Sequence, residues 1–124
     1  MEAFKVLYVD DEADIREVAA ISLALDPALD VRVCASGQEA ISEAAAWQPN
    51  LIFLDLMMPG MDGAETMARL RAADRTAAIP VVFVTARTQP KEIERLMSLG
   101  AMGVIAKPFE PMELAPQARH YLDG

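Results

Sequence analysis

Chemically capable side chains stand at the ends of four short apolar runs in this sequence. The runs and the residues that follow them are 6–9 before Asp10 and Asp11, 51–54 before Asp55, 81–84 before Thr85, and 102–106 before Lys107. A continuous apolar run bounded by polar residues is typical of a parallel strand covered on both faces. In an open α/β sheet, ligands bind beyond the carboxyl ends of the strands. We therefore expect three carboxylates, a hydroxyl and an ammonium in one crevice, which predicts a site for a metal ion and a phosphoryl group.

Each of these side chains has a role in such a site. Asp55 follows the central strand, where the crevice is deepest, so we expect this carboxylate to be the nucleophile that becomes covalently modified. Asp11 and Asp55 supply hard oxygen ligands that suit Mg²⁺, and Asp10 can orient a metal-bound water. Thr85 and Lys107 can bind the oxygens of a transferring phosphoryl group and neutralise their charge.

Every one of the five residues also has a simpler explanation. Asp10 or Asp11 could cap the following helix, Thr85 could merely end a strand, and Lys107 could lie in solvent. Their joint occurrence at strand ends, all on the same side of the sheet, favours the site over five separate coincidences.

Composition limits the class of protein. The 124 residues suit one domain, and 53% hydrophobic residues suffice for a packed core. We find no apolar stretch long enough to span a membrane and no signal-peptide pattern, so we expect a cytoplasmic protein without membrane contact. The formal net charge of −8 argues against autonomous binding of nucleic acid. Cys34, the only cysteine, is expected to be buried, and His120 to lie on the surface.

Strands and helices alternate along the whole chain. The predicted strands are 4–9, 31–34, 51–54, 79–84 and 102–106, and the predicted helices are 12–25, 36–47, 64–74, 90–100 and a last helix that ends by 122. Repeated β-α units form parallel sheets with right-handed crossovers. The fold we predict is a flavodoxin-like, doubly wound (βα)5 domain with strand order 2-1-3-4-5. This order places strand 31–34, whose end offers little chemistry, outside strand 4–9.

Several side chains have expected places in these elements. The core positions that periodicity predicts are Val18, Ile21 and Leu25 in the first helix, Met67 and Leu70 in the third, and Ile93, Leu96 and Met97 in the fourth. Ser36 and Glu39 form a capping box. Methionines are expected mainly as core filler, and Trp47 to pack at the end of its helix. Pro111 and Pro116 predict a last helix that is short and irregular at its start.

The Lys107–Pro108 peptide bond is expected to be cis. The chain must turn sharply there while the Lys107 side chain points back into the crevice, and the cis form costs little before proline.

With the motifs in place, the sequence resembles the receiver domain of bacterial two-component response regulators over all 124 residues. The matching segments are Val9-Asp10-Asp11, the run from Asp55 to Gly63, Thr85-Ala86, and Lys107-Pro108-Phe109. Each segment alone is weak, but the four in this order and spacing are specific. The resemblance implies that Asp55 is the phosphoacceptor, that Asp10 and Asp11 are the acidic pair, that Thr85 is the switch hydroxyl and that Lys107 binds the phosphoryl group.

The resemblance also implies a metal and partners. Mg²⁺, for which Mn²⁺ could substitute, would be held by Asp11, Asp55 and the backbone carbonyl of Met57, with Asp10 in the same acidic cluster. The phosphoryl group would come from the phosphohistidine of a sensor histidine kinase or histidine phosphotransfer protein. Apart from Mg²⁺-dependent self-phosphorylation and autodephosphorylation, the domain would not be an enzyme, and it would signal through a downstream protein that the sequence does not identify.

Two features depart from the most common family pattern. Val104 stands where the family carries a switch aromatic, so we expect the signal to pass through the 86–90 loop to the face formed by helix 90–100, strand 102–106 and the last helix. No segment follows the last helix, so the sequence predicts a stand-alone receiver domain over residues 1–124 without an output domain.

Met57 and Arg87 lie two residues after Asp55 and Thr85, at the expected mouth of the site. Met57 offers an attacking water no hydrogen-bond partner, and Arg87 could cover the phosphoryl oxygens, which predicts a long-lived aspartyl phosphate. Arg87 could equally point into solvent.

Three other functions are alternatives to a phosphorylated signalling domain. A receiver-fold adaptor that acts without phosphotransfer is the main alternative, but a scaffold needs no cluster of repelling carboxylates. An aspartate-nucleophile phosphatase would need a second carboxylate two residues after the nucleophile, where Met57 stands. A flavin-binding module would need a Ser/Thr/Gly-rich phosphate loop after strand 4–9, and none is present.

Overall fold

A computed structural model describes residues 3–123 as five strands and five helices that alternate along the chain. In chain order they are β1 (Phe4–Val9), α1 (Ala13–Leu23), β2 (Leu29–Cys34), α2 (Gly37–Trp47), β3 (Leu51–Asp55), α3 (Gly63–Ala72), β4 (Val81–Thr85), α4 (Pro90–Ser98), β5 (Gly103–Ala106) and α5 (Pro111–Asp123). The strands form one parallel sheet in the order β2-β1-β3-β4-β5. The predicted flavodoxin-like fold is therefore confirmed.

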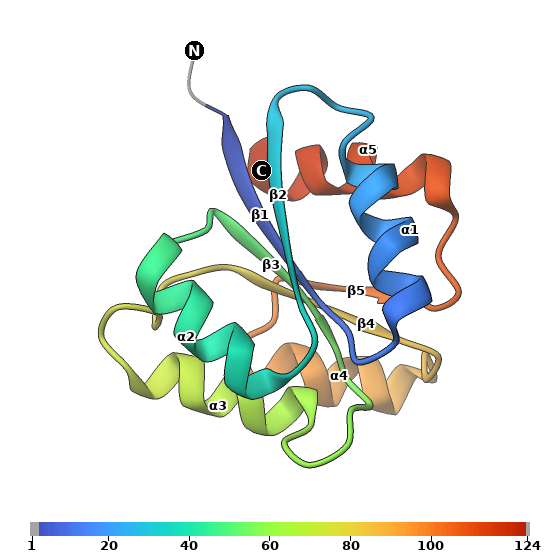
Figure 1. Cartoon of the computed structure of the whole chain (residues 1–124). Helices are drawn as coiled ribbons and strands as arrows, with labels where there is room; N and C mark the ends of the chain where they lie inside the picture. The colour runs from blue at the N-terminus through green and yellow to red at the C-terminus, as the bar shows by residue number, and fades with distance from the viewer. Residues whose placement is uncertain (1–2, 124) are drawn as a thin grey trace.

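Helices cover both faces of the sheet. Figure 1 shows α1 and α5 on one face and α2, α3 and α4 on the other. All residues of β3 and β4 are buried, as are Val6–Val9 of β1. Burial on both faces explains why these strands read as unbroken apolar runs in the sequence.

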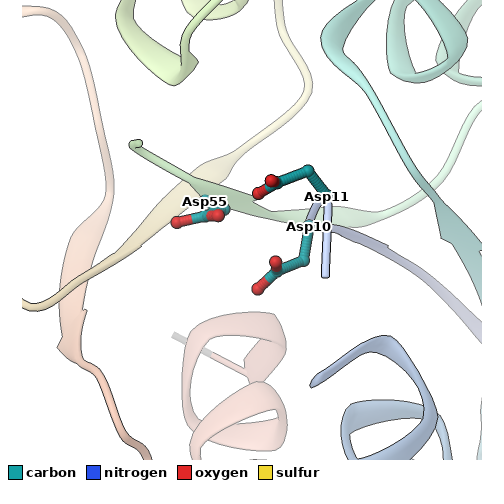
Figure 2. A group of neighbouring side chains, drawn as sticks. All are labelled: Asp10, Asp11 and Asp55. Carbon is teal, nitrogen blue, oxygen red and sulfur yellow. The ribbon is translucent and has the colours of Figure 1, made fainter. Parts of the chain in front are cut away.

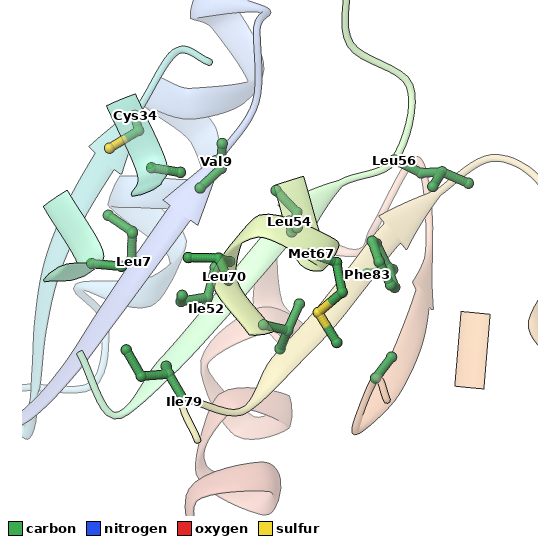
Figure 3. Close-up of a cluster of buried hydrophobic side chains, with 14 of the residues drawn as sticks. Leu7, Val9, Cys34, Ile52, Leu54, Leu56, Met67, Leu70, Ile79 and Phe83 are labelled. Carbon is green, nitrogen blue, oxygen red and sulfur yellow. The ribbon is translucent and has the colours of Figure 1, made fainter. Parts of the chain in front are cut away.

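Alternate residues of each strand contribute side chains to two separate hydrophobic cores. On the α2–α4 face, Leu7, Ile52 and Phe83 pack with Met67 and Leu70 of α3 (Figure 3). The residues that pack together on the α1–α5 face are Val6, Tyr8, Phe53 and Val82 of the strands, Ala19 and Leu23 of α1, and Leu114 and Ala118 of α5. Because side chains alternate across a strand, the same strands build both cores.

Short polar contacts begin the helices on the α2–α4 face. The Ser36 hydroxyl accepts a hydrogen bond from the backbone N–H of Glu39 at 3.1 Å, and the Glu39 carboxylate accepts one from the N–H of Ala35 at 3.2 Å. The predicted capping of α2 is therefore confirmed. At the start of α3, the Asp62 carboxylate accepts a hydrogen bond from the N–H of Glu65 at 2.8 Å.

Gly63 allows α3 to begin directly against the end of β3. A Cβ atom at this position would lie 2.5 Å from the carbonyl oxygen of Asp55 and 2.8 Å from the Cα of Leu56. The backbone N–H of Gly63 donates a hydrogen bond to the Leu56 carbonyl at 2.9 Å. This close approach ties the loop after β3 to the strand that carries Asp55, and it leaves no room for a side chain.

The predicted core face of α1 is wrong. Val18, Ile21 and Leu25 are 40%, 62% and 58% exposed, whereas Ala19 and Leu23 are buried. The helix carries apolar residues around most of its circumference, so periodicity leaves its rotation undetermined. Packing against both the sheet and α5 selects the face with the small Ala19, and Leu25 lies beyond the end of the helix.

Other expectations need smaller corrections. In α4, Leu96 is fully buried and Ile93 is half-buried, but Met97 is 44% exposed because the helix meets the core along one narrow line. Met58 and Met67 are buried, yet Met57, Met102 and Met112 join Met97 on the surface, so the described methionines are mostly not core filler.

The last helix also differs from its prediction, because α5 is the longest helix described. Pro111 occupies its first position, where the missing N–H costs nothing. Pro116 lies inside the helix at an exposed position. Met112, whose backbone carbonyl it leaves without a donor, is also exposed, so water can reach that carbonyl. Strand and helix ends otherwise shift by at most two residues. Two-residue changes occur at the starts of β2 and β4 and at the ends of α1, α3 and α4.

Three single residues lie where the sequence predicted. Cys34 is buried, and burial raises the pKa of its thiol to about 11. Trp47 is buried at the end of α2, and His120 is exposed on α5. Within residues 3–123, the helices are all too short or too polar to cross a membrane.

Candidate functional site

The carboxyl ends of the strands bring the predicted site residues together. Asp10 and Asp11 follow β1, and Asp55 is the last residue of β3. One carboxylate oxygen from each of the three lies within 4.8 Å of the others, as Figure 2 illustrates. Thr85 is the last residue of β4, and Lys107 directly follows β5. The parallel strand order therefore accounts for the whole arrangement.

Two of the three carboxylates are buried. Asp10 is fully inaccessible and Asp55 is 3% exposed, whereas Asp11 is exposed. Thr85 is buried as well, at 1%. Buried carboxylates at this separation repel each other, because the protein interior screens charge poorly. Cationic partners would stabilise the cluster.

Lys107 supplies one such cation. Its Nζ lies 2.9 Å from Oδ2 of Asp10, 3.4 Å from Oδ2 of Asp55 and 3.7 Å from a carboxylate oxygen of Glu12. Burial alone would lower the pKa of Lys107, but its hydrogen bond to Asp10 and the charge of Asp55 raise that pKa above its ordinary value. The ammonium therefore stays charged, and it is closer to Asp10 than to Asp55.

The backbone around Lys107 directs its side chain into the site. The Lys107–Pro108 peptide bond is cis, as predicted from the sequence. The backbone N–H of Lys107 donates a hydrogen bond to the Thr85 carbonyl at 2.8 Å, which continues the pairing of β4 and β5.

Asp10 is held by donors from several elements. Its Oδ1 accepts a hydrogen bond from the backbone N–H of Glu12 at 3.0 Å, and its Oδ2 accepts from Lys107 at 2.9 Å and from the Tyr8 hydroxyl at 3.4 Å. Arg16 donates to the Asp10 carbonyl at 2.9 Å. The Asp10 carboxylate is thereby fixed in place, and both of its oxygens already accept hydrogen bonds.

Asp55 is bound much less completely. Its Oδ2 is buried and makes no hydrogen bond within the described residues, although Lys107 lies close enough for a charge interaction. Burial, followed by the charge of Asp10, raises the pKa of Asp55 to about 7, against the opposing charge of Lys107. An oxygen of this kind has the most to gain from a cation or from covalent bond formation.

The site opens to solvent through a cleft of about 390 Å³. Its lining residues are Glu12, Ile15, Asp55, Met57, Ala86, Lys107 and Pro108. Met57 is 56% exposed at this opening and Arg87 is exposed on the neighbouring loop. The Thr85 hydroxyl oxygen accepts a hydrogen bond from the N–H of Arg87 at 3.0 Å, which leaves the hydroxyl proton free to donate.

Sequence reasoning missed two residues of the site. Glu12 lines the cleft beside Lys107, and its position next to the acidic pair was the available signal. Tyr8 reaches Asp10 from beneath, and its place two residues earlier on β1 puts both side chains on one face of the strand.

Known proteins provide an independent comparison. A family model for the response regulator receiver domain matches residues 6–119. The chain belongs to this family. Solved structures agree: a putative response regulator from Chloroflexus aurantiacus J-10-fl matches with a TM-score of 0.88 and 29% identity, over 99% of this chain and 100% of that one. Chemotaxis protein CheY4 of Vibrio cholerae matches with a TM-score of 0.87 and 29% identity, over 96% and 98%.

Curated relatives of this receiver domain are longer proteins. The probable transcriptional regulator ycf27 of Porphyridium aerugineum is 37% identical over 122 residues, which cover 98% of this chain and 49% of that protein. The DNA-binding response regulator MtrA of Mycobacterium tuberculosis H37Rv is 35% identical over 115 residues, 93% of this chain and 49% of that protein. The chain thus spans about half the length of these relatives.

Proposed function

We propose that this receiver domain accepts a phosphoryl group on Asp55 from the phosphohistidine of a histidine kinase or histidine phosphotransfer protein, and that phosphorylation changes its binding to a downstream protein. Response regulators as a family receive phosphoryl groups from kinases. The observation that carries the proposal for Asp55 is its buried Oδ2. This oxygen accepts no hydrogen bond from the described part of the chain, although it lies beside a charged lysine and beneath an open cleft.

The proposed reaction moves one phosphoryl group between two side chains. A carboxylate oxygen of Asp55 forms a bond to phosphorus while the bond from phosphorus to the donor imidazole nitrogen breaks. The electron pair of the broken bond stays on that nitrogen, and the imidazole, which carries a proton on its other ring nitrogen, leaves as a neutral group. Lys107 and the free hydroxyl proton of Thr85 would bind the phosphoryl oxygens, which supplies the positioning and charge neutralisation on which phosphoryl transfer depends.

A divalent cation fits the acidic side of this site. Receiver domains bind Mg²⁺ at an acidic pocket, and here Asp10, Asp11 and Asp55 offer hard oxygen atoms that lie within 4.8 Å of one another. We propose that Asp11 and Asp55 bind Mg²⁺ with the backbone carbonyl of Met57, that Asp10 assists, and that Mn²⁺ can substitute. When bound, the ion would neutralise charge between the carboxylates and the incoming phosphoryl oxygens.

Incubation with acetyl phosphate and Mg²⁺, followed by intact mass measurement, tests the proposal. We expect the wild-type protein to gain one phosphate, Asp55→Asn to gain none, and Asp10→Asn to gain it slowly. Asp74→Asn is the matched control, because Asp74 is an exposed aspartate outside the site. Full labelling of Asp55→Asn would show that the phosphoacceptor is another residue, and an unlabelled wild-type protein would favour the adaptor that acts without phosphotransfer.

We propose that this domain itself contacts proteins rather than nucleic acid. Its formal charge of −8 would repel a phosphate backbone. MtrA is named as a DNA-binding regulator, but this chain matches only about half of that protein, so its DNA binding is not transferred to this domain. A mobility-shift titration of the domain with duplex DNA at low salt should show no complex.

A further inference from the structure

An aromatic layer lies directly beneath the charged site. The Tyr8 ring packs edge-on to Phe109 with centroids 6.1 Å apart, and tilts against Phe53 at 6.2 Å. Each ring stands two residues from a charged side chain of the site: Tyr8 from Asp10, Phe53 from Asp55, and Phe109 from Lys107. Tyr8 is fully buried, so this layer places its hydroxyl at the site and shields it from water.

The Tyr8 hydroxyl has one hydrogen-bond partner among the described residues, Oδ2 of Asp10. The same oxygen also accepts the shorter hydrogen bond from Lys107. At 3.4 Å the tyrosine contact is long for an O–H···O hydrogen bond, because the ammonium already occupies the better position. Two donors thus compete for one oxygen of a fully buried carboxylate.

The proposed reaction changes this balance. When Lys107 turns to a phosphoryl group on Asp55, Oδ2 of Asp10 loses its closer donor. Leaving a buried carboxylate oxygen without a hydrogen-bond donor raises the free energy of the folded protein, and this increase would oppose the movement of Lys107. The Tyr8 hydroxyl is already in place to shorten its contact and replace the ammonium.

We infer that Tyr8 is a positioning residue: when Lys107 moves to the phosphoryl group, the Tyr8 hydroxyl replaces the ammonium as the hydrogen-bond donor to Oδ2 of Asp10. Its action is indirect, since it touches neither phosphoryl group nor donor and works only through Asp10. The inference rests on the proposed phosphorylation of Asp55. It adds a residue to the site that supports the release of Lys107 rather than the chemistry itself.

Near-ultraviolet absorption can follow this exchange. The chain has two tyrosines, so Tyr121→Phe leaves Tyr8 as the only one. A phenol that donates a stronger hydrogen bond absorbs at longer wavelength. Adding beryllofluoride, a phosphoryl mimic, with Mg²⁺ should therefore move the Tyr8 band to longer wavelength, whereas Mg²⁺ alone should move it less. Trp47 packs against Lys5 and Arg32 at the other end of the sheet, so its absorption should stay constant.

A second variant tests the competition without any phosphoryl group. In Tyr121→Phe/Lys107→Met, Oδ2 of Asp10 has no ammonium, so the Tyr8 band should already lie at the longer wavelength and beryllofluoride should not move it further. An unshifted band in this variant overturns the inference about Tyr8. The measurement needs no phosphate uptake, so it tests the competition for Oδ2 of Asp10 separately from the assignment of Asp55 as the phosphoacceptor.

Kinetics supply the second readout. Tyr8→Phe should be phosphorylated by acetyl phosphate about twofold to tenfold more slowly than Tyr121→Phe at the same Mg²⁺ concentration, the effect of one net hydrogen bond. Urea unfolding shows whether Tyr8→Phe is folded in the assay, and if it is not, the spectral test decides alone. Equal rates in two folded variants would mean that the Tyr8 hydroxyl has no part in the site.

Discussion

Asp10 and Asp55 are both buried at the end of the sheet, but their surroundings differ. Asp10 accepts hydrogen bonds at both carboxylate oxygens, whereas Oδ2 of Asp55 accepts none from residues 3–123. One ammonium, that of Lys107, lies between them. Donors thus hold Asp10 in place, whereas Oδ2 of Asp55 is open to a new partner, which supports the proposed role of Asp55 as the phosphoacceptor. The difference also has a measurable effect on stability.

Without a divalent cation, the contribution of Asp55 to the unfolding free energy should fall as the pH rises from about 4 to about 7. In the unfolded chain Asp55 loses its proton near 3.8, whereas burial and Asp10 raise its pKa in the folded state to about 7. The folded state therefore holds more protons in this window, and stability declines until the folded pKa is passed. Asp55→Asn removes the cost, so at pH 8 it should be more stable than wild type by up to about 4 kcal/mol.

Urea unfolding in EDTA at pH 4, 6 and 8 measures this difference. The gain in Asp55→Asn should be greatest at pH 8 and nearly absent at pH 4. Asp74→Asn should follow the wild-type curve at every pH, because its side chain is exposed. A gain of the same size at pH 4 and pH 8 would exclude ionisation of Asp55 as the cause.

Among the helices and strands, α1 provides a direct test of which side chains are buried, because it carries one fully buried and one exposed large apolar residue. Leu23→Ala should lower the unfolding free energy by roughly 2–5 kcal/mol, because Leu23 is fully buried between the sheet and α5. Ile21→Ala should change it by about 0.5 kcal/mol or less, because Ile21 is 62% exposed. Chemical denaturation of the two variants provides the comparison. Equal losses would mean that α1 is rotated relative to the structure described here.

The element pair α4 and β5 is where the output signal is predicted to pass. Val104 lies on β5, half-buried against the core on the α2–α4 face, and is too short and stiff to swing as an aromatic would. Addition of beryllofluoride with Mg²⁺ should therefore shift amide resonances across residues 86–106, through backbone movement that starts at Thr85. Changes confined to residues 10–11 and 55–60 would mean that the signal leaves the domain by another face. Asp55→Asn, treated in the same way, should show neither set of changes.

For the molecule as a whole, Mg²⁺ should act as a stabilising ligand. An ion that binds only the folded state raises the melting temperature, and here it would also relieve the repulsion among three clustered carboxylates. Thermal scans at millimolar MgCl₂ should show a rise in wild type and in Asp74→Asn, and little or none in Asp11→Asn. NaCl at equal ionic strength controls for general screening. An equal rise in all three proteins would argue against binding at this site.

Two expectations about the whole protein stay predictions. The family match covers residues 6–119, and the curated relatives are about twice as long as this chain. The absence of an output domain and the cytoplasmic location therefore rest on the sequence argument alone.

The sequence by itself determined the fold and the five side chains that the strand ends bring to the site, whereas Tyr8 and Glu12 were found only in the structure. Apolar runs such as 51–54 do not alternate with polar residues, so both faces of each strand must be buried. This requirement leads to a parallel sheet with helices on each side. Because parallel strands present their carboxyl ends together, the residues after those runs had to meet. Local order along the chain was therefore enough to bring together Asp10, Asp55 and Lys107.

Only the tertiary structure decided which groups touch and which are buried. Ile21 and Leu23 are equally apolar, so no pattern could say which one faces the core, and packing of α1 against α5 selected Leu23. Lys107 and Asp10 are 97 residues apart, and their 2.9 Å contact depends on how β1 and the end of β5 are placed around β3 and β4. The raised pKa of Asp55 has the same origin, since burial and the distance between charges are properties of the packed molecule.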